Sequence, residues 1–200
     1  MGGIKPKSRD HIYDESIIEK LFKKVNDPLD QVALILMIYG GMRVGEVAHS
    51  DATWWDGADM NIPKSKPCQC CDCRKDKRHP GEWQPKTDMA TRRIPFRPEL
   101  RKVITAYFKR YPEIGLSRVS LWRRVKTLAK RAGVSRIENI FPHAMRATFI
   151  TNSLEQKIPD WVVRQVVGHE NVATTSGYAR LSKKTVDTEM KKAWEKSKDA

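Results

Sequence analysis

The sequence contains no apolar run long enough to cross a membrane, which takes about 18 consecutive residues. It shows no secretory signal, because the opening Met-Gly-Gly leads into charged, proline-containing sequence rather than an apolar stretch. Acidic residues are also scarce: 24 Asp and Glu stand against 38 Lys and Arg, a formal net charge of +14. These shortages argue against a membrane or secreted protein, and we expect an intracellular protein of the cytoplasm.

The excess of positive charge favours a polyanionic partner. Each Lys or Arg that neutralises a phosphate releases a counterion, so a basic surface gains affinity for nucleic acid. No long basic amphipathic helix stands out, which makes a membrane surface the weaker candidate. Hydrophobic residues make up 40% of the 200 residues, enough for one folded core, and no internal repeat is present.

Helical periodicity dominates the two ends of the chain. Near the start it predicts helices over residues 16–25, 28–39 and 42–49, the second of them apolar on nearly every face and therefore buried. Later helices are expected to begin after Pro98, Ser117, Pro142 and Pro159. The apolar stripe of the helix after Ser117 is predicted to be Val119, Trp122, Val125 and Ala129. In the helix that begins at Pro142, the residues Met145, Phe149 and Leu154 are predicted to point inward.

Residues 53–96 have a different character, with tryptophans, turn residues and short β-compatible runs. They predict a small three-stranded antiparallel sheet with strands near 59–63, 82–86 and 92–96. A cysteine-rich insertion, over about 64–82, interrupts this sheet. The expected fold class is therefore α+β, mainly α, with one small antiparallel sheet.

Three short motifs place polar side chains where helices begin or end. The motif Gly-Met-Arg-Val-Gly-Glu at 41–46 puts Arg43 just after a glycine break. His143 and Arg146 are three residues apart, so they share one face of a helix. His169 follows a helix-ending glycine and precedes Tyr178 by nine residues. Each motif alone is common on a solvated surface, and only their combination is informative.

In this order the motifs resemble the tyrosine recombinase family, which includes phage integrases and the Xer recombinases. The family pattern is a Gly-(Leu/Met)-Arg-x-x-Glu box, a hairpin lysine, a His-x-x-Arg box, a Leu-Gly-His box and a later tyrosine. All five parts occur within residues 16–182. The departures are Val167, where the family usually has Leu, and Ala147, where His is commoner. The resemblance implies a catalytic domain at 16–182, after a linker at 1–15 and before a tail helix at 183–200.

The resemblance also implies a function. Such an enzyme is a site-specific recombinase (integrase), which breaks and rejoins double-stranded DNA through a covalent 3′-phosphotyrosine during integration or excision of a mobile element. The implied catalytic residues are Arg43, Lys86, His143, Arg146, His169 and Tyr178, with Glu46 in support. Tyr178 is the nucleophile, and Lys86 protonates the leaving 5′ oxygen.

The residue types suit this chemistry. Planar guanidiniums bind two phosphate oxygens at once, so Arg43 and Arg146 can stabilise the charge of the transition state in place of a metal ion. His143 and His169 titrate near neutrality and can bind the phosphate or transfer protons. No cofactor is therefore expected for catalysis.

All four cysteines fall within six residues, at Cys68, Cys70, Cys71 and Cys73, and His79 follows six residues later. The family does not normally carry such an insertion. In an intracellular protein a cluster of this kind more often binds metal than forms disulfides. The two Cys-x-x-Cys pairs are interleaved, however, so a structural zinc and an unbound or redox-variable loop both remain open. The basic run that follows, at 74–78, is either a DNA contact or a solvated loop.

Two other functions also fit the sequence. A type IB topoisomerase or telomere resolvase shares the nucleophile and the arginines, although the short chain and the Gly-His box favour a recombinase. A non-catalytic DNA-binding regulator on the same scaffold would not need the complete set of motif residues. The family usually adds an N-terminal helical domain that clamps DNA, and we expect that this chain is a truncation lacking it.

The last predicted helix carries an apolar stripe of Val186, Met190, Ala193 and Trp194. In the family such tails dock on a neighbouring protomer and couple the active sites of a tetramer on DNA. The resemblance therefore predicts self-association on DNA. The alternative is that the tail folds back on its own core.

Overall fold

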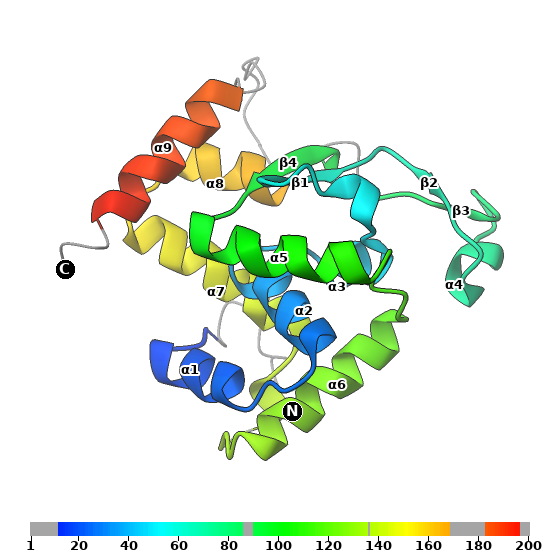
Figure 1. The fold of residues 1–200 in the computed structure, drawn as a ribbon, viewed down its shortest axis with the longest axis horizontal. Helices are drawn as coiled ribbons and strands as arrows, with labels where there is room; N and C mark the ends of the chain where they lie inside the picture. Colours follow the sequence, from blue (N-terminus) through cyan, green and yellow to red (C-terminus); the bar gives the residue numbers. More distant parts are fainter. Residues whose placement is uncertain (1–11, 86–89, 136, 169–182, 197–200) are drawn as a thin grey trace, which may run out of the picture.

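The structure is a computed structural model that describes residues 12–85, 90–135, 137–168 and 183–196. Helices form most of this part of the chain, and a small antiparallel β region lies against them (Figure 1). The α-helices are α1 (Glu15–Lys23), α2 (Pro28–Ile38), α3 (Val44–His49), α4 (Cys71–Arg74), α5 (Pro98–Arg110), α6 (Arg118–Arg131), α7 (Pro142–Glu155), α8 (Asp160–Val167) and α9 (Lys183–Lys196). The strands are β1 (Asp59–Ile62), β2 (Lys66–Pro67), β3 (Glu82–Trp83) and β4 (Arg92–Pro95). None of the described helices is both long and apolar enough to cross a membrane.

Helix α2 is the centre of the core. It begins at a capped end, where the Asp27 carboxylate accepts a hydrogen bond from Leu29 N at 2.9 Å. Every residue from Val32 to Ile38 is buried, and α2 contacts α3, α5, α6 and α7. The prediction of a helix buried on all faces is confirmed, because an apolar surface all round needs partners on every side.

A glycine turn connects α2 to α3. Gly41 has a φ of +60°, and a Cβ at this position would lie 2.4 Å from Cδ1 of Phe149 on α7. The close approach of the backbone to that ring therefore requires glycine. Helix α3 begins at Val44, slightly later than predicted, and Arg43 is the residue that precedes it as the N-cap.

The sheet prediction was wrong in one respect. Strand β1 pairs with β4, and β2 pairs with β3, so the described residues contain two two-stranded sheets instead of one with three strands. The insertion closes on itself, with Cys68 N donating to Gly81 O and Gly81 N donating to Cys73 O. Trp83 of β3 packs beside Trp54, at 5.0 Å between ring centroids. The fold remains mainly α with a small antiparallel β region.

Two predicted apolar faces were also partly wrong. Ser117 caps α6 as expected, but Val119 and Trp122 are 56% and 44% exposed. The buried face of α6 consists of Leu121, Val125, Leu128 and Ala129. On α7, Met145 and Phe149 are buried as predicted, whereas Leu154 is exposed. Val119, Trp122 and Val125 are three residues apart, as residues on one helix face often are. Val119 and Trp122 nevertheless lie to one side of the face of α6 that contacts α3 and α2.

Part of the predicted linker belongs to the folded domain. Tyr13 is buried; its backbone N donates to Thr148 Oγ1 at 2.9 Å, and its hydroxyl donates to Asn139 O at 3.0 Å. Burial raises the pKa of Tyr13 far above its usual range, so its phenol stays protonated. The domain therefore begins before α1.

The tail helix α9 lies on its own domain. Met190 is buried and lines one cavity with Ile38 and Phe149, and the guanidinium of Arg97 lies over the ring of Trp194, at 5.9 Å from its centroid. Arg93 of β4 also donates to Asp187 Oδ1 at 2.7 Å. Of the predicted stripe, the side chains of Val186 and Ala193 lie outside the described part. The described contacts agree with the alternative in which the tail folds back on its own core.

Candidate functional site

Two arginines meet at the C-terminal end of α8. Arg146, buried in α7, donates through Nη2 to Val167 O and through Nη1 to Gly41 O, each at 2.5 Å. Arg43, at the start of α3, donates through Nη2 to Gly168 O at 2.8 Å. The last carbonyls of a helix carry partial negative charge, so they attract both guanidiniums. The sequence-predicted arginines thus converge, although 103 positions separate them in the chain.

A buried carboxylate holds this arrangement together. Glu46 is 2% exposed and accepts hydrogen bonds from the backbone N and Nη1 of Arg43, at 2.8 and 2.9 Å. It also accepts two from Arg92, at 3.0 and 2.9 Å. The carboxylate therefore joins Arg43 to a second, fully buried cation, Arg92, while the supporting role of Glu46 in catalysis stays a prediction.

Arg92 is a site residue that the sequence reasoning missed. Besides Glu46, its guanidinium donates to Val166 O at 2.6 Å and to Ala90 O at 2.7 Å. A signal was present, because Arg92 and Ile94 are two apart on one strand and therefore point to the same side of it. Ile94 is fully buried, so Arg92 points inward as well.

The site carries an excess of positive charge. Burial opposes ionisation of Glu46, but Arg92 and then Arg43 lower the pKa of that carboxyl below its usual range. Burial, reinforced by the charges of Arg43 and Arg92, lowers the pKa of Arg146 to about 9. Arg146 therefore stays charged at neutral pH, and three guanidiniums surround one carboxylate. Such a group favours an anion.

A cavity of about 380 Å³ opens beside Arg43. Arg43 and the exposed His143 both line it, as do Pro85, Trp83 and Arg118. Arg146 does not line the cavity and is buried in the protein interior.

Three predicted residues lie outside the described part of the chain: Lys86, His169 and Tyr178. Lys86 directly follows Pro85 in the sequence, and His169 directly follows Gly168. Both of these neighbours belong to the site just described.

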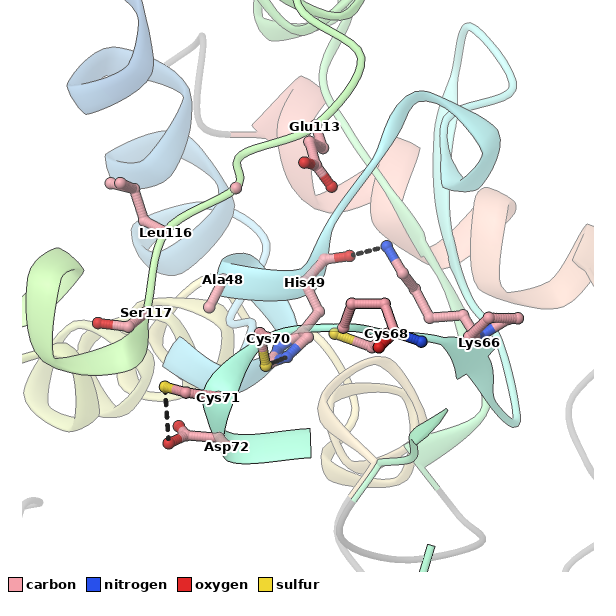
Figure 2. Close-up of a pocket in the computed structure, with 13 residues that line it drawn as sticks. Ala48, His49, Lys66, Cys68, Cys70, Cys71, Asp72, Glu113, Leu116 and Ser117 are labelled. Atoms are coloured by element: carbon pink, nitrogen blue, oxygen red, sulfur yellow. Dashed lines mark hydrogen bonds between the residues drawn. The ribbon is translucent and has the colours of Figure 1, made fainter. Parts of the chain in front are cut away.

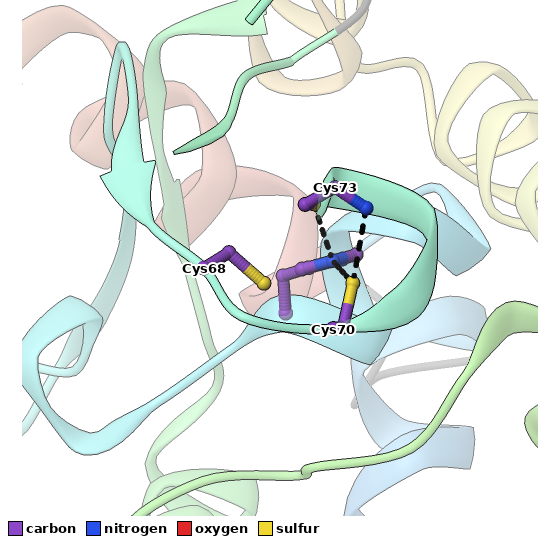
Figure 3. Close-up of side chains that lie close together, drawn as sticks. Cys68, Cys70 and Cys73 are labelled. Atoms are coloured by element: carbon purple, nitrogen blue, oxygen red, sulfur yellow. Dashed lines mark hydrogen bonds between the residues drawn. The ribbon is translucent and has the colours of Figure 1, made fainter. Parts of the chain in front are cut away.

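The cysteine cluster forms a second group beside the first. Cys68, Cys70 and Cys73 lie with His49 of α3, and their four ligand atoms are all within 4.8 Å of one another (Figure 3). Two of the predicted metal ligands are not part of this group. Cys71 is exposed and turned toward Asp72, with 3.8 Å between Sγ and Oδ1 (Figure 2), and His79 is exposed. The sequence reasoning missed His49 because it lies on α3, outside the insertion.

A cavity of about 400 Å³ lies against this cluster, lined by His49, Lys66 and Cys71 among others (Figure 2). Burial lowers the pKa of His49, which favours the neutral imidazole. Lys66 donates to His49 O at 3.0 Å and pairs with Asp51 at 2.6 Å, so β2 is also joined to the end of α3.

Comparison with known proteins gives a consistent set of relatives. Residues 85–185 match the model of the phage integrase family. Over 94% of its length the chain is 25% identical to tyrosine recombinase XerA of Pyrococcus horikoshii. It is 33% identical to XerD of Listeria monocytogenes over 69 residues, which are 34% of this chain and 23% of that protein. The chain spans 63% of the length of XerA, less than two thirds.

Solved structures share the fold. The crystal structure of XerA recombinase aligns with a TM-score of 0.63 at 19% identity, over 96% of this chain and 66% of that one. The integrase of mycobacterium phage Brujita aligns with a TM-score of 0.66 at 18% identity, over 95% and 58%. The Tn1549 transposon integrase in complex with transposon right-end DNA gives 0.62 at 18% identity, over 95% and 67%.

Proposed function

Because this chain belongs to the phage integrase family, we propose that it contains the catalytic domain of a site-specific DNA recombinase. The enzyme cleaves and rejoins double-stranded DNA inside the cell through a covalent 3′-phosphotyrosine. The observation that carries the proposal is the convergence of Arg43 and Arg146 on the C-terminal end of α8. Gly168, the residue at this end, directly precedes His169 in the sequence.

The arginines suit a phosphodiester in the transition state. A guanidinium has five N–H donors, so Arg43, which lines the cavity, can hold the carbonyl of Gly168 and still donate to phosphate oxygens. Arg146, buried and away from the cavity lining, adds positive charge to the site. Glu46 and Arg92 fix the position of Arg43 in advance, which means that little reorganisation is needed when charge develops on the phosphate. His143, on the same cavity as Arg43, would bind a non-bridging oxygen or transfer a proton.

The remaining steps rest on the family motifs, because their residues lie outside the described part of the chain. The hydroxyl of Tyr178 gives its proton to a histidine of the motifs, His143 or His169, as its oxygen attacks phosphorus, and the bond from phosphorus to the 5′ oxygen breaks. Lys86 gives a proton to that 5′ oxygen. A 5′ hydroxyl from another strand then attacks the phosphotyrosine, which restores both the phosphodiester and the tyrosine.

This chemistry draws on side chains for its positive charge, so the proposal requires no catalytic cofactor. The cysteine cluster lies beside the arginine cavity, and a zinc ion bound there would be structural. Self-association into a tetramer on DNA is also part of the proposal. In such a tetramer α9 docks on a neighbouring protomer, so it must leave the position on its own domain in which Met190 is buried.

The test is strand exchange between two duplexes that carry the site selected by the protein from a random DNA pool. The wild-type protein should exchange strands, and Arg146→Ala should lose both exchange and part of its DNA affinity. Arg164→Ala is the matched control, because Arg164 lies on the surface of α8 in an exposed pair with Asp160. Arg146→Lys keeps a charge at the buried position, and its folding is checked by circular dichroism.

Three results would contradict the proposal. Unchanged exchange in folded Arg146→Ala and Arg146→Lys would remove the role of the guanidinium. Relaxation of supercoils without exchange would indicate a topoisomerase. Tight DNA binding without cleavage would indicate a regulator.

A further inference from the structure

The insertion between β1 and β4 has almost no apolar interior. From residue 69 to residue 80 every side chain is exposed except those of Cys70 and Cys73. Its strands β2 and β3 have two residues each, and α4 has four. A segment this small cannot bury enough apolar area to hold one conformation, and small units of this kind are usually fastened by disulfides or a metal.

The side chains that do turn inward have the chemistry of metal ligands. Nε2 of His49 is 3.4 Å from Sγ of Cys70 and 3.5 Å from Sγ of Cys73. Cys68 completes a group of four ligand atoms that all lie within 4.8 Å of one another. With bonds of about 2.3 Å to sulfur and 2.0–2.1 Å to nitrogen, a tetrahedral zinc places nitrogen and sulfur about 3.5 Å apart and two sulfurs about 3.8 Å apart. The observed distances therefore need to shorten by about 1.3 Å at most to reach this geometry.

The histidine is already oriented for a metal. Its Nδ1 lies 2.7 Å from Gly45 O, and a carbonyl can only accept, so Nδ1 carries the proton and Nε2 presents its lone pair to the cysteines. Trp83 stacks on the imidazole at 5.5 Å between ring centroids and fixes the plane of the ring.

The cysteine loop is also arranged to support thiolates. The backbone N of Cys73 donates to Sγ of Cys70 at 3.4 Å, and Arg74 N donates to Cys70 O at 2.9 Å. Hydrogen bonds to ligand atoms from the surrounding protein are a usual part of metal sites. Three thiolates, a neutral imidazole and a divalent ion together carry one negative charge.

We propose that His49, Cys68, Cys70 and Cys73 bind a structural zinc ion, which fastens the insertion to α3. The ion joins three ligands from the insertion to one from the helix that begins after Arg43 and carries Glu46. Zinc binding therefore restrains the same helix that presents the arginine cluster. This last consequence rests on the proposed function, whereas the ion and its ligands do not.

The test measures metal content and coordination in the protein without DNA. Protein purified under reducing conditions without added zinc should contain about one equivalent by mass spectrometry of the metal. X-ray absorption at the zinc edge should show three sulfurs at about 2.3 Å and one nitrogen at about 2.0–2.1 Å. Cobalt exchanged into the site should give the thiolate charge-transfer band and the intense visible bands of a tetrahedral ion.

Matched variants separate the ligands from their neighbours. Cys73→Ser and His49→Asn should lower zinc content to below about a tenth of an equivalent after dialysis against a weak chelator. Cys71→Ser and His79→Asn are the controls, since both residues are exposed and outside the group, and each should keep the full equivalent. If Cys73→Ser does not fold, the absorption and cobalt spectra of the wild-type protein still decide the ligand set.

The proposal is overturned by protein that neither contains zinc nor binds it on titration. It is equally overturned if the wild-type spectrum shows four sulfurs, or if Cys71→Ser loses zinc while Cys73→Ser keeps it. A disulfide among these cysteines under reducing conditions would also contradict it. None of these results depends on DNA cleavage, so a failure of the zinc proposal would not count against the proposed recombinase function.

Discussion

Replacing Glu46 by Gln tests the buried ion cluster behind the proposed active site. The carboxylate accepts two hydrogen bonds from Arg43 and two from Arg92, and its side chain is 3% exposed. Glutamine keeps the shape but removes the negative charge, and its amide group turns N–H donors toward guanidiniums that are also donors. Arg92 has a fully buried side chain, so its charge cannot be solvated by water instead.

The expected loss follows from this burial. Breaking a buried ion pair by removing one partner costs about 3–5 kcal/mol, and the amide oxygen of glutamine still accepts a bond, so we expect about 3 kcal/mol. For a protein of this size the melting temperature falls by about 2–4 °C per kcal/mol, which gives a fall of roughly 6–12 °C.

The assay is thermal unfolding followed by circular dichroism, with Glu19→Gln as the matched control. Glu19 pairs with Lys23 on the surface of α1, where both side chains are more than half exposed, and its replacement should leave the melting temperature unchanged. A Glu46→Gln protein as stable as the wild type would refute the idea that the carboxylate compensates the buried arginines.

The same comparison has a defined pH dependence. The pKa of Glu46 is lowered in the folded state, so its stabilisation is complete above the unfolded pKa of about 4.3. It is lost as pH falls through the lower folded pKa, because the carboxyl then takes up a proton in both states. The stability difference between the wild type and Glu46→Gln should therefore shrink in acid, and a difference that grows there would contradict the assignment.

Two further substitutions test the packing around the site. Gly41→Ala should lower the melting temperature more than Gly57→Ala, because both glycines have positive φ but only at Gly41 would the new Cβ meet a neighbour, the ring of Phe149; equal losses would count against the clash. Met190→Ala should reduce the free energy of unfolding in urea by about 2 kcal/mol if α9 docks on its own core, while the exposed Lys191→Ala should not change it. An unaffected Met190→Ala would mean that α9 does not stabilise its own domain.

Much of the helical part of the fold is predictable from local signals. Ser117 caps α6 through its hydroxyl, and proline occupies the first turn of α7, both at the predicted positions. Gly168 ends α8 in the left-handed conformation that glycine adopts most easily. These features depend on a few neighbouring residues, so the sequence reports them directly.

The errors involve contacts between distant segments. Strand β3 is too short for periodicity to identify its partner, and it pairs with β2 because the insertion folds back on itself. The face of α6 that is buried depends on where α2 and α3 lie, which the helix alone does not specify. His49 joins the cysteines only after α3 and the insertion have folded against each other.

The motifs predicted two of the three arginines of the site, and only the folded structure shows how their side chains are held. Arg43 and Arg146 were recognised by their place in the family pattern, but nothing local indicates that both bind the end of α8. Arg92 was not predicted as a site residue. Its role depends on a buried partner, Glu46, that lies 46 residues earlier in the chain.

The most direct test of the account is to trap and map the covalent intermediate. A duplex with the selected site and a nick next to the scissile phosphate releases a short fragment after cleavage, so the protein stays attached to DNA. Digestion and mass spectrometry of the adduct should place the phosphate on Tyr178, and Tyr178→Phe should bind the same DNA without forming an adduct, since it lacks the attacking oxygen. An adduct on a different residue, or cleavage by Tyr178→Phe at the wild-type rate, would contradict the proposed function.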